Sequence, residues 1–358
     1  MIAVECNGQN LRSLLREPPH INDPLNAVCR TLELKPYNND SLENYLGQPV
    51  KLWYKNKLWF FGFLRSRRYS SDGSADYKAY EPTVFMKNNP DDYYFKDVTA
   101  TQGIKQLGEK AGLKIGSLTD TGAVLSQLYY QNKDPDKIAI DLLARTYRAN
   151  GKKFWFRYDP EEGLILFERT TPKKVWAFQV GVNLEQAEYK DSIEKTVTIV
   201  KLVNRETGKT VTISDTTKLK QYGPSTHFEE VDKQAAQIMD QLANDLLKRK
   251  GVVEKSQKIK GYNPGSMPQF YSGDVIYVEE KKTGVIGAYH IKNVVQVFLS
   301  DNLIGLDFDI QEAPEVPIIQ YENAQKPPVQ KEDTGVQQEY SEEMKKLMDK
   351  YGIDPGEG

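Results

Sequence analysis

The sequence predicts a mainly β protein with an α+β insert, in which two β-barrel domains flank a small mixed α/β domain and an extended C-terminal tail follows. Three observations predict this arrangement. Residues 1–95 and 171–311 contain short apolar or alternating runs divided by turns, whereas residues 96–170 show helical spacing. Residues 312–358 are acidic and rich in proline. These four ranges are the domains that we expect in the 358-residue chain.

The first β block contains the most apolar strand of the chain. Residues 50–54 and 58–64 flank three polar residues, which predicts a hairpin. Residues 58–64 read Leu-Trp-Phe-Phe-Gly-Phe-Leu and are apolar on both faces. A strand buried on both faces is expected inside a barrel or a sandwich, or at a packed subunit interface. The residues that we assign to the barrel core or to a subunit interface are Leu58, Trp59, Phe60, Phe61 and Phe63.

Two short helices and a hairpin make up the predicted insert. Thr99 can cap a helix whose apolar face includes Ile104. A second helix has Asp134 as its N-cap, a proline in its first turn and Gly151 as its C-cap. Two apolar runs within residues 154–167 flank a polar turn, which predicts a second hairpin. This pattern predicts a small mixed α/β domain with few residues that could perform catalysis.

The second β block is interrupted by the strongest helical pattern of the sequence, over residues 228–250. Acidic residues lie in its first turn and basic residues in its last, which complements the helix dipole. One stripe of this helix carries Val231, Ala235, Ile238, Leu242 and Leu246. Strands are expected afterwards at residues 274–280, 285–291, 293–299 and 303–310.

The last 47 residues differ in composition from the rest of the chain. They hold 11 acidic side chains against 5 lysines and contain 5 of the 18 prolines. Such a segment cannot bury enough apolar surface to form a core alone, which predicts an extended tail. Apolar residues at helical spacing near its end predict either a nascent helix or a peptide that docks on a partner. The candidate docking residues are Tyr340, Met344, Leu347, Met348 and Tyr351.

The sequence offers little that could perform catalysis. The three histidines, His20, His227 and His290, lie far apart, and none has a histidine or cysteine partner at metal-ligand spacing. Cys29 falls in an alternating strand pattern and not at the head of a helix, where a thiolate would be stabilised. No glycine-rich phosphate motif occurs. We therefore predict no catalytic, cofactor-binding or metal-binding residues and no enzyme activity.

Composition limits the compartment and the classes of partner. The chain has 48 basic and 50 acidic residues, which excludes a strongly basic nucleic-acid binder. Its two cysteines, Cys6 and Cys29, exclude a disulfide scaffold and indicate synthesis in a reducing cytosol. No apolar run approaches the ~18 residues of a membrane span, and no basic-then-apolar segment opens the sequence. We expect neither a membrane span nor a secretory signal.

An ordered set of motifs carries a resemblance to a known family. Residues 46–54 read Leu-Gly-Gln-Pro-Val-Lys-Leu-Trp-Tyr and are followed by the aromatic strand 58–64. Residues 77–82 then read Tyr-Lys-Ala-Tyr-Glu-Pro. The late motifs lie at 271–278, 287–294 and 303–308. The set resembles the baseplate hub proteins of contractile phage tails, in particular the PBSX-type prophage tail hub and the hubs of phage-tail-like bacteriocins. The resemblance covers about residues 1–312 and leaves the acidic tail outside it.

The resemblance implies a structural protein with two tail-tube-like β-barrels per chain. Three copies would form a pseudo-six-fold ring that joins a hexameric tail tube to a trimeric spike and nucleates tube assembly. The implied partners are the chain itself as a homotrimer, the tail tube protein, the spike, and other baseplate and tape-measure proteins. Neither a membrane nor a specific nucleic acid is implied, although a genome can pass through the lumen. The implied location is the virion tail baseplate or a bacteriocin particle, assembled in the bacterial cytoplasm.

Two other function classes stay open from the sequence. A tail-associated cell-wall hydrolase or carbohydrate-binding protein would need a cleft with a charged constellation. A hexameric tube or distal tail protein would usually carry one barrel per chain. Subunit count separates the second alternative from a trimeric hub with two barrels, and a cell-wall clearing assay tests the first.

Overall fold

The computed structural model describes the chain except for residues 26, 38–44, 171–174, 232–238 and 313–358. All described helices and strands belong to one compact unit that comprises residues 1–320. The predicted docking residues Tyr340, Met344, Leu347, Met348 and Tyr351 lie outside the described residues, as does nearly all of the predicted tail domain. None of the described helices is long and apolar enough to cross a membrane.

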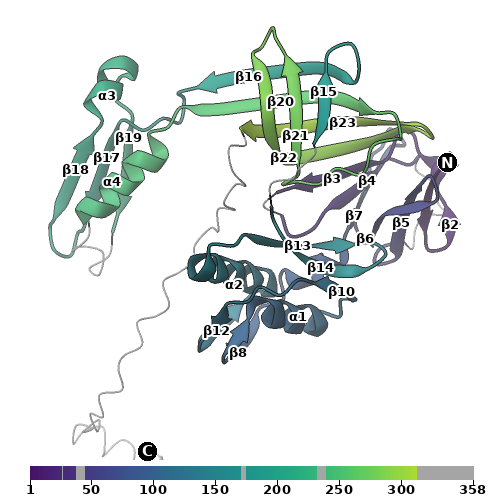
Figure 1. Ribbon diagram of the computed structural model, residues 1–358, viewed down its shortest axis with the longest axis horizontal. Helices are drawn as coiled ribbons and strands as arrows, with labels where there is room; N and C mark the ends of the chain where they lie inside the picture. The colour runs from purple at the N-terminus through teal and green to yellow at the C-terminus, as the bar shows by residue number, and fades with distance from the viewer. Residues whose placement is uncertain (26, 38–44, 171–174, 232–238, 313–358) are drawn as a thin grey trace, which may run out of the picture. The chain divides into compact units, whose positions relative to one another are not determined.

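A single sheet of 13 strands takes up most of both β blocks (Figure 1). The strands from the first block are β1 Ile2–Cys6, β2 Gln9–Asn10, β3 His20–Pro24, β4 Thr31–Leu34, β5 Pro49–Tyr54, β6 Lys57–Tyr69 and β7 Ala75–Tyr80. Those from the second block are β15 Trp176–Gln179, β16 Leu184–Ser192, β20 Glu254–Asn263, β21 Val275–Glu280, β22 Val285–Ser300 and β23 Leu303–Glu312. The hydrogen-bonded order of the main path is β16-β20-β23-β22-β3-β4-β7-β6-β5-β1-β2. Off this path, β21 pairs with β22, and β15 pairs with β21.

The two β blocks meet where β3 pairs antiparallel with β22. Pro24 lies opposite Asn293, and His20 lies opposite Val297. The mainly β prediction is confirmed; thirteen of the described strands form one sheet that joins the two blocks, and no closed barrel is detected among the described strands. The physical reason is the length of β22: its first half pairs with β21, and its second half extends past β21 and pairs with β3. The strands expected at 285–291 and 293–299 are accordingly one strand with a register shift between Ile291 and Asn293.

One hydrophobic core serves both blocks. Its buried members include Val4, Leu32 and Phe60 from the first block and Ile276 and Phe308 from the second. Near the β3–β22 seam, three aromatic rings pack edge to face with centroids 5.3–5.6 Å apart. They are Tyr54 of β5, Trp59 of β6 and Phe298 of β22. The blocks therefore share buried surface and do not fold around separate cores.

The predicted hairpin of β5 and β6 is confirmed. Tyr54 pairs with Lys57, which leaves Lys55 and Asn56 as a two-residue loop. Both loop residues have positive φ, 49° and 63°, as a type I′ turn requires. Asparagine tolerates positive φ better than most residues, whereas lysine adopts it at a cost in conformational free energy. β6 continues to Tyr69, beyond the apolar run that predicted it.

The insert has the predicted helices and hairpin. α1 Ala100–Lys110 begins with a capping box between Thr99 and Gln102, and α2 Pro135–Asn150 ends at Gly151 in the left-handed conformation. β13 Phe154–Asp159 and β14 Gly163–Glu168 form the hairpin, and β10 Ile115–Leu118 joins it in parallel. The remaining elements are η1 Arg12–Leu14 and η3 Pro82–Met86 in the first block, and β8 Asp91–Phe95, β9 Val98–Thr99, β11 Val124–Leu125 and β12 Leu128–Lys133 around the insert.

A second, smaller core lies within the segment that leads from β16 to β20. It contains β17 Ile199–Val203, β18 Thr210–Ser214, α3 Thr216–Tyr222, β19 Thr226–Glu230 and α4 Met239–Lys250. Val200, Leu202, Ala243 and Leu246 are among its buried residues. This corrects the predicted helix over 228–250, because residues 228–230 belong to β19, and the described part of the helix begins at Met239. Hydrogen bonding of β19 to β17 overrides the helical spacing of its apolar residues.

Trp59 offers a direct test of the shared core. Trp59→Asp would bury a charge between Tyr54 and Phe298 without a partner, and we expect the chain to lose its cooperative unfolding transition. Trp59→Phe keeps an aromatic ring there and should retain the transition with a lower midpoint. Circular dichroism during thermal unfolding measures both variants. A cooperative Trp59→Asp protein with an unchanged midpoint would contradict the account of the core.

Candidate functional site: a buried polar junction between the insert and the sheet

The described residues hold no evident catalytic centre. No group of three or more histidine, cysteine or acidic side chains among them could hold a metal ion. His20, His227 and His290 lie on three different strands, β3, β19 and β22. Both cysteines are buried, and burial raises the pKa of the Cys6 and Cys29 thiols to about 11. At neutral pH they are therefore protonated and poorly nucleophilic.

The structure places the five apolar candidates of β6 on two faces of that strand. Leu58, Trp59 and Phe60 are buried, with Trp59 and Phe60 in the shared core, whereas Phe61 and Phe63 are half-buried on the other side. Phe61 lies 6.3 Å from the ring of Tyr158 in β13, and Phe63 lies 5.3 Å from the ring of Phe85 in η3. The second apolar face of β6 thus contacts the insert and the turn that leads into it.

A buried ion pair lies beside this aromatic contact. Arg30, just before β4, donates from Nε to Glu81 Oε1 at 2.8 Å, and the Arg30 backbone N–H donates to Glu81 Oε2 at 3.0 Å. Glu81 directly follows β7, and both side chains are at most 3% exposed. Burial raises the pKa of Glu81, and the adjacent guanidinium opposes that rise. The pair fixes the chain on entry to β4 and on exit from β7.

Tyr271 connects the ion pair to the insert and to the second block. The guanidinium of Arg157 in β13 lies 3.6 Å from the centroid of the Tyr271 ring, and that of Arg30 lies 4.9 Å from it. The Tyr271 hydroxyl donates to Gln269 Oε1, and Gln269 Nε2 donates to the Trp59 carbonyl at 3.2 Å. Cation–π contacts of desolvated guanidinium groups are worth up to ~2 kcal/mol each. One tyrosine thus links the first block, the insert and the second block.

Two aspartates complete what we call the polar junction, which comprises Asp23, Arg30, Glu81, Arg157, Tyr271 and Asp274. Asp23 of β3 accepts hydrogen bonds from the backbone N–H and hydroxyl of Ser272 at 2.9 and 3.1 Å. Asp274 accepts from the Tyr271 N–H at 2.9 Å. Burial raises the pKa of Asp274 to about 6, with the Tyr271 hydrogen bond and nearby Arg157 opposing the rise.

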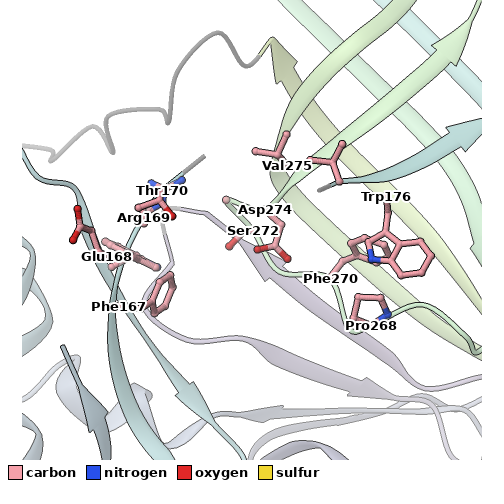
Figure 2. A pocket seen from close by; sticks show the side chains of 13 residues that line it. Phe167, Glu168, Arg169, Thr170, Trp176, Pro268, Phe270, Ser272, Asp274 and Val275 are labelled. Atoms are coloured by element: carbon pink, nitrogen blue, oxygen red, sulfur yellow. The ribbon is translucent and has the colours of Figure 1, made fainter. Parts of the chain in front are cut away.

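A cavity of about 290 Å³ lies against one side of the polar junction (Figure 2). Phe167 and Arg169 of the insert line one wall, and Trp176, Phe270 and Asp274 line the other. Its lining mixes aromatic rings with the guanidinium of Arg169 and the carboxylates of Glu168 and Asp274. The arrangement can hold two parts of the molecule in register.

Sequence reasoning missed most of the polar junction. Glu81 lay within the recognised Tyr-Lys-Ala-Tyr-Glu-Pro motif, so a signal for it existed. Tyr271 and Asp274 lay within the late motif at 271–278, whereas Arg30 and Arg157 fell in or near strand patterns where a charged side chain usually faces solvent. The contacts that bring these side chains together join residues more than 100 positions apart, such as Arg30 with Tyr271, and no local pattern reveals them.

A double-mutant cycle tests the buried ion pair. Arg30→Met alone leaves the Glu81 carboxylate buried without its cation, and we expect a loss of about 3 kcal/mol in the free energy of unfolding. Arg30→Met combined with Glu81→Leu removes both charges, so it should be clearly more stable than Arg30→Met. Urea unfolding followed by tryptophan fluorescence measures the cycle. Additive losses in the double variant would contradict a coupled pair.

The sequence and the fold both match known proteins. A family model described as YQBQ-like matches residues 21–304. The phage-like element PBSX protein XkdQ of Bacillus subtilis (strain 168) is 26% identical over 250 residues, which is 68% of this chain and 75% of XkdQ. The resemblance to the PBSX-type family that the sequence motifs indicated is thereby confirmed.

Two solved structures share the fold at low sequence identity. The 43 kDa tail protein of prophage MuSo2 from Shewanella oneidensis has a TM-score of 0.59 at 14% identity, covering 86% of this chain and 97% of that protein. The E. coli c3393 protein has a TM-score of 0.50 at 11% identity, covering 88% and 79%. It is described as a component of the type VI secretion system with structural similarity to the T4 bacteriophage tail proteins gp27 and gp5.

Proposed function

Because the chain belongs to the YQBQ-like family, we propose that it is a non-enzymatic structural hub of a contractile phage tail or tail-like particle. Three copies form a pseudo-six-fold ring that joins a hexameric tail tube to a trimeric spike and nucleates the tube. The ring lies in the tail baseplate and assembles in the bacterial cytoplasm. Its partners are the tube protein, the spike, and other baseplate and tape-measure proteins. The names of XkdQ and of the prophage tail protein support a tail component.

One observation of the fold carries the pseudo-six-fold part of the proposal: the two halves of the main sheet repeat one topology. In the first half the hydrogen-bonded order is β5-β6-β7-β4-β3, and in the second it is β21-β22-β23-β20-β16. Each half also carries the same irregularity. The register of β6 on β7 shifts between Leu64 and Ser66, and that of β22 on β23 shifts between Ile291 and Asn293. Two like halves per chain give six like units in a ring of three chains.

Deletion of the coding sequence from a producing strain tests the hub role. Without the chain, tubes should lack a nucleus, so electron microscopy should show at least about a tenfold loss of complete tails, since the costly first step of a cooperative assembly is removed. The full chain supplied in trans should restore them. Normal numbers of complete tails in the deletion strain would overturn the proposal.

We also propose that the acidic tail docks on a partner through the apolar stripe Tyr340, Met344, Leu347, Met348 and Tyr351. Its helical spacing of apolar residues suits a groove on another protein. Deletion of residues 336–358 should leave the thermal midpoint of the chain within about 2 °C, since every described core residue is kept, and weaken one assembly step. Tail yield and unfolding are measured together. Normal tail assembly by the truncated chain would contradict the docking role.

A further inference from the structure

We propose that the end of β6, residues 66–69, pairs antiparallel with β16 of the next copy of this chain, so that the main sheet continues from chain to chain around the ring. The inference rests on the proposed hub function, since it specifies how the three copies join. It derives from the internal repeat of the sheet.

The β3–β22 seam is the template within one chain. β22 pairs with β23 along one side. Along its other side it pairs first with β21, over Val285–His290, and then with β3, over Asn293–Val297. β3 in turn pairs with β4 on its far side. The second half of β22 thus receives a strand from the other half of the sheet.

The counterparts of these two strands are both open-edged in the part of the chain that the structure describes. β6, the counterpart of β22, pairs with β7 on one side and with β5 only as far as Phe63 on the other. No described strand pairs with the β5 side of residues 66–69. β16, the counterpart of β3, pairs with β20 and with no described strand on its other side. An edge of this kind is a ready template for pairing with another chain.

The register of the new seam follows from the registers already in the chain. The matching register shifts make Ser66 equivalent to Asn293. The paired residues can be followed from β6 through β7 and β4 to β3, and from β22 through β23 and β20 to β16. Glu188 of β16 then has the position that His20 has in β3. Asn293 pairs with Pro24. Transferred to the open edges, the pairs are Ser66 with Ser192, Arg67 with Asp191, Arg68 with Lys190, and Tyr69 with Tyr189 of the next copy.

The side chains that this register brings together are complementary at most positions. Arg67 meets Asp191, an opposite-charge pair directly across the strands. Tyr69 meets Tyr189, and these rings are among the exposed large apolar side chains of the chain, at 39% and 38%. Arg68 lies opposite Lys190, an unfavourable pair, but diagonal to Glu188. Charge and aromatic area therefore favour a second copy of this chain as the occupant.

The proposed seam closes the ring and covers the open edges of β16 and of the end of β6. The contact is head to tail, because the end of β6 and β16 are different surfaces. Such contacts form a closed ring when the rotation returns to the start. With three copies, three β3–β22 seams inside chains alternate with three β6–β16 seams between chains. The two kinds of seam are equivalent in topology, which is what a pseudo-six-fold ring built from three chains requires.

Paired cysteines test the seam in assembled particles. Arg68→Cys with Lys190→Cys places two thiols opposite each other and removes the like-charge pair. The matched control is Arg68→Cys with Glu185→Cys, which lies five residues, or about 17 Å, farther along β16. Native Cys6 and Cys29 are buried and do not compete. Tail particles from producing cells carrying the full-length variants are oxidised and run on non-reducing gels.

We expect bands at two and three copies from the first variant and about tenfold less cross-link from the control, whose thiols lie beyond disulfide reach. If the chain is present in particles but runs on the gel as one uncross-linked copy, the edge pairing is overturned while the hub role stands. The same holds if both variants cross-link equally. If the wild-type chain is missing from purified tails, the hub role fails and the seam fails with it.

A charge swap provides a second readout. Arg67→Asp and Asp191→Arg should each lower the yield of complete tails, and the double variant should restore it to within about twofold, because the pair is re-formed with reversed signs. Lys57→Glu changes a charge at the other end of β6 and should have no effect. Equal losses in the double variant and the singles, with thermal midpoints like that of the wild type, would contradict the proposed register.

Discussion

The antiparallel seam between β3 and β22 is the contact on which the rest of the molecule depends. It joins residues about 270 positions apart and converts two β blocks into one sheet with one core. Pairing of this range is slow to form because the loop entropy must be overcome before the contact stabilises anything. Two local features make this pairing possible. The strand β22 extends beyond the end of its pairing with β21, and the Tyr54–Trp59–Phe298 cluster buries aromatic surface beside the seam.

The polar junction has a different role from the core. A buried ion pair contributes little net stability, because desolvation of both ions offsets most of their attraction. It is selective about geometry, however, since any other placement leaves a charge buried without a partner. Arg30, Glu81, Arg157 and Tyr271 therefore orient the insert on the sheet, while apolar contacts such as Phe61 with Tyr158 supply burial.

Local patterns predicted the local structure well. The Thr99 cap, the Gly151 stop and the turn at Lys55 and Asn56 each depend on a few neighbouring residues, and the structure has all of them. The helix expected from residue 228 failed because β19 gains its hydrogen bonds from β17, a partner that spacing along the chain cannot indicate. The pairing of both β blocks in one sheet and the polar junction were missed for the same reason. Both arise from pairings between distant segments, which periodicity does not encode.

The copy number of the full-length chain in its assembled form shows whether one chain supplies two units of the ring. Light scattering across a concentration series gives the mass, and negative-stain images of the same sample give the symmetry. We expect a closed ring of three chains in which six similar lobes are visible. A stable ring of six chains would contradict this expectation, because each chain would then supply one unit of the ring, and the repeated topology of the two half-sheets would not be used.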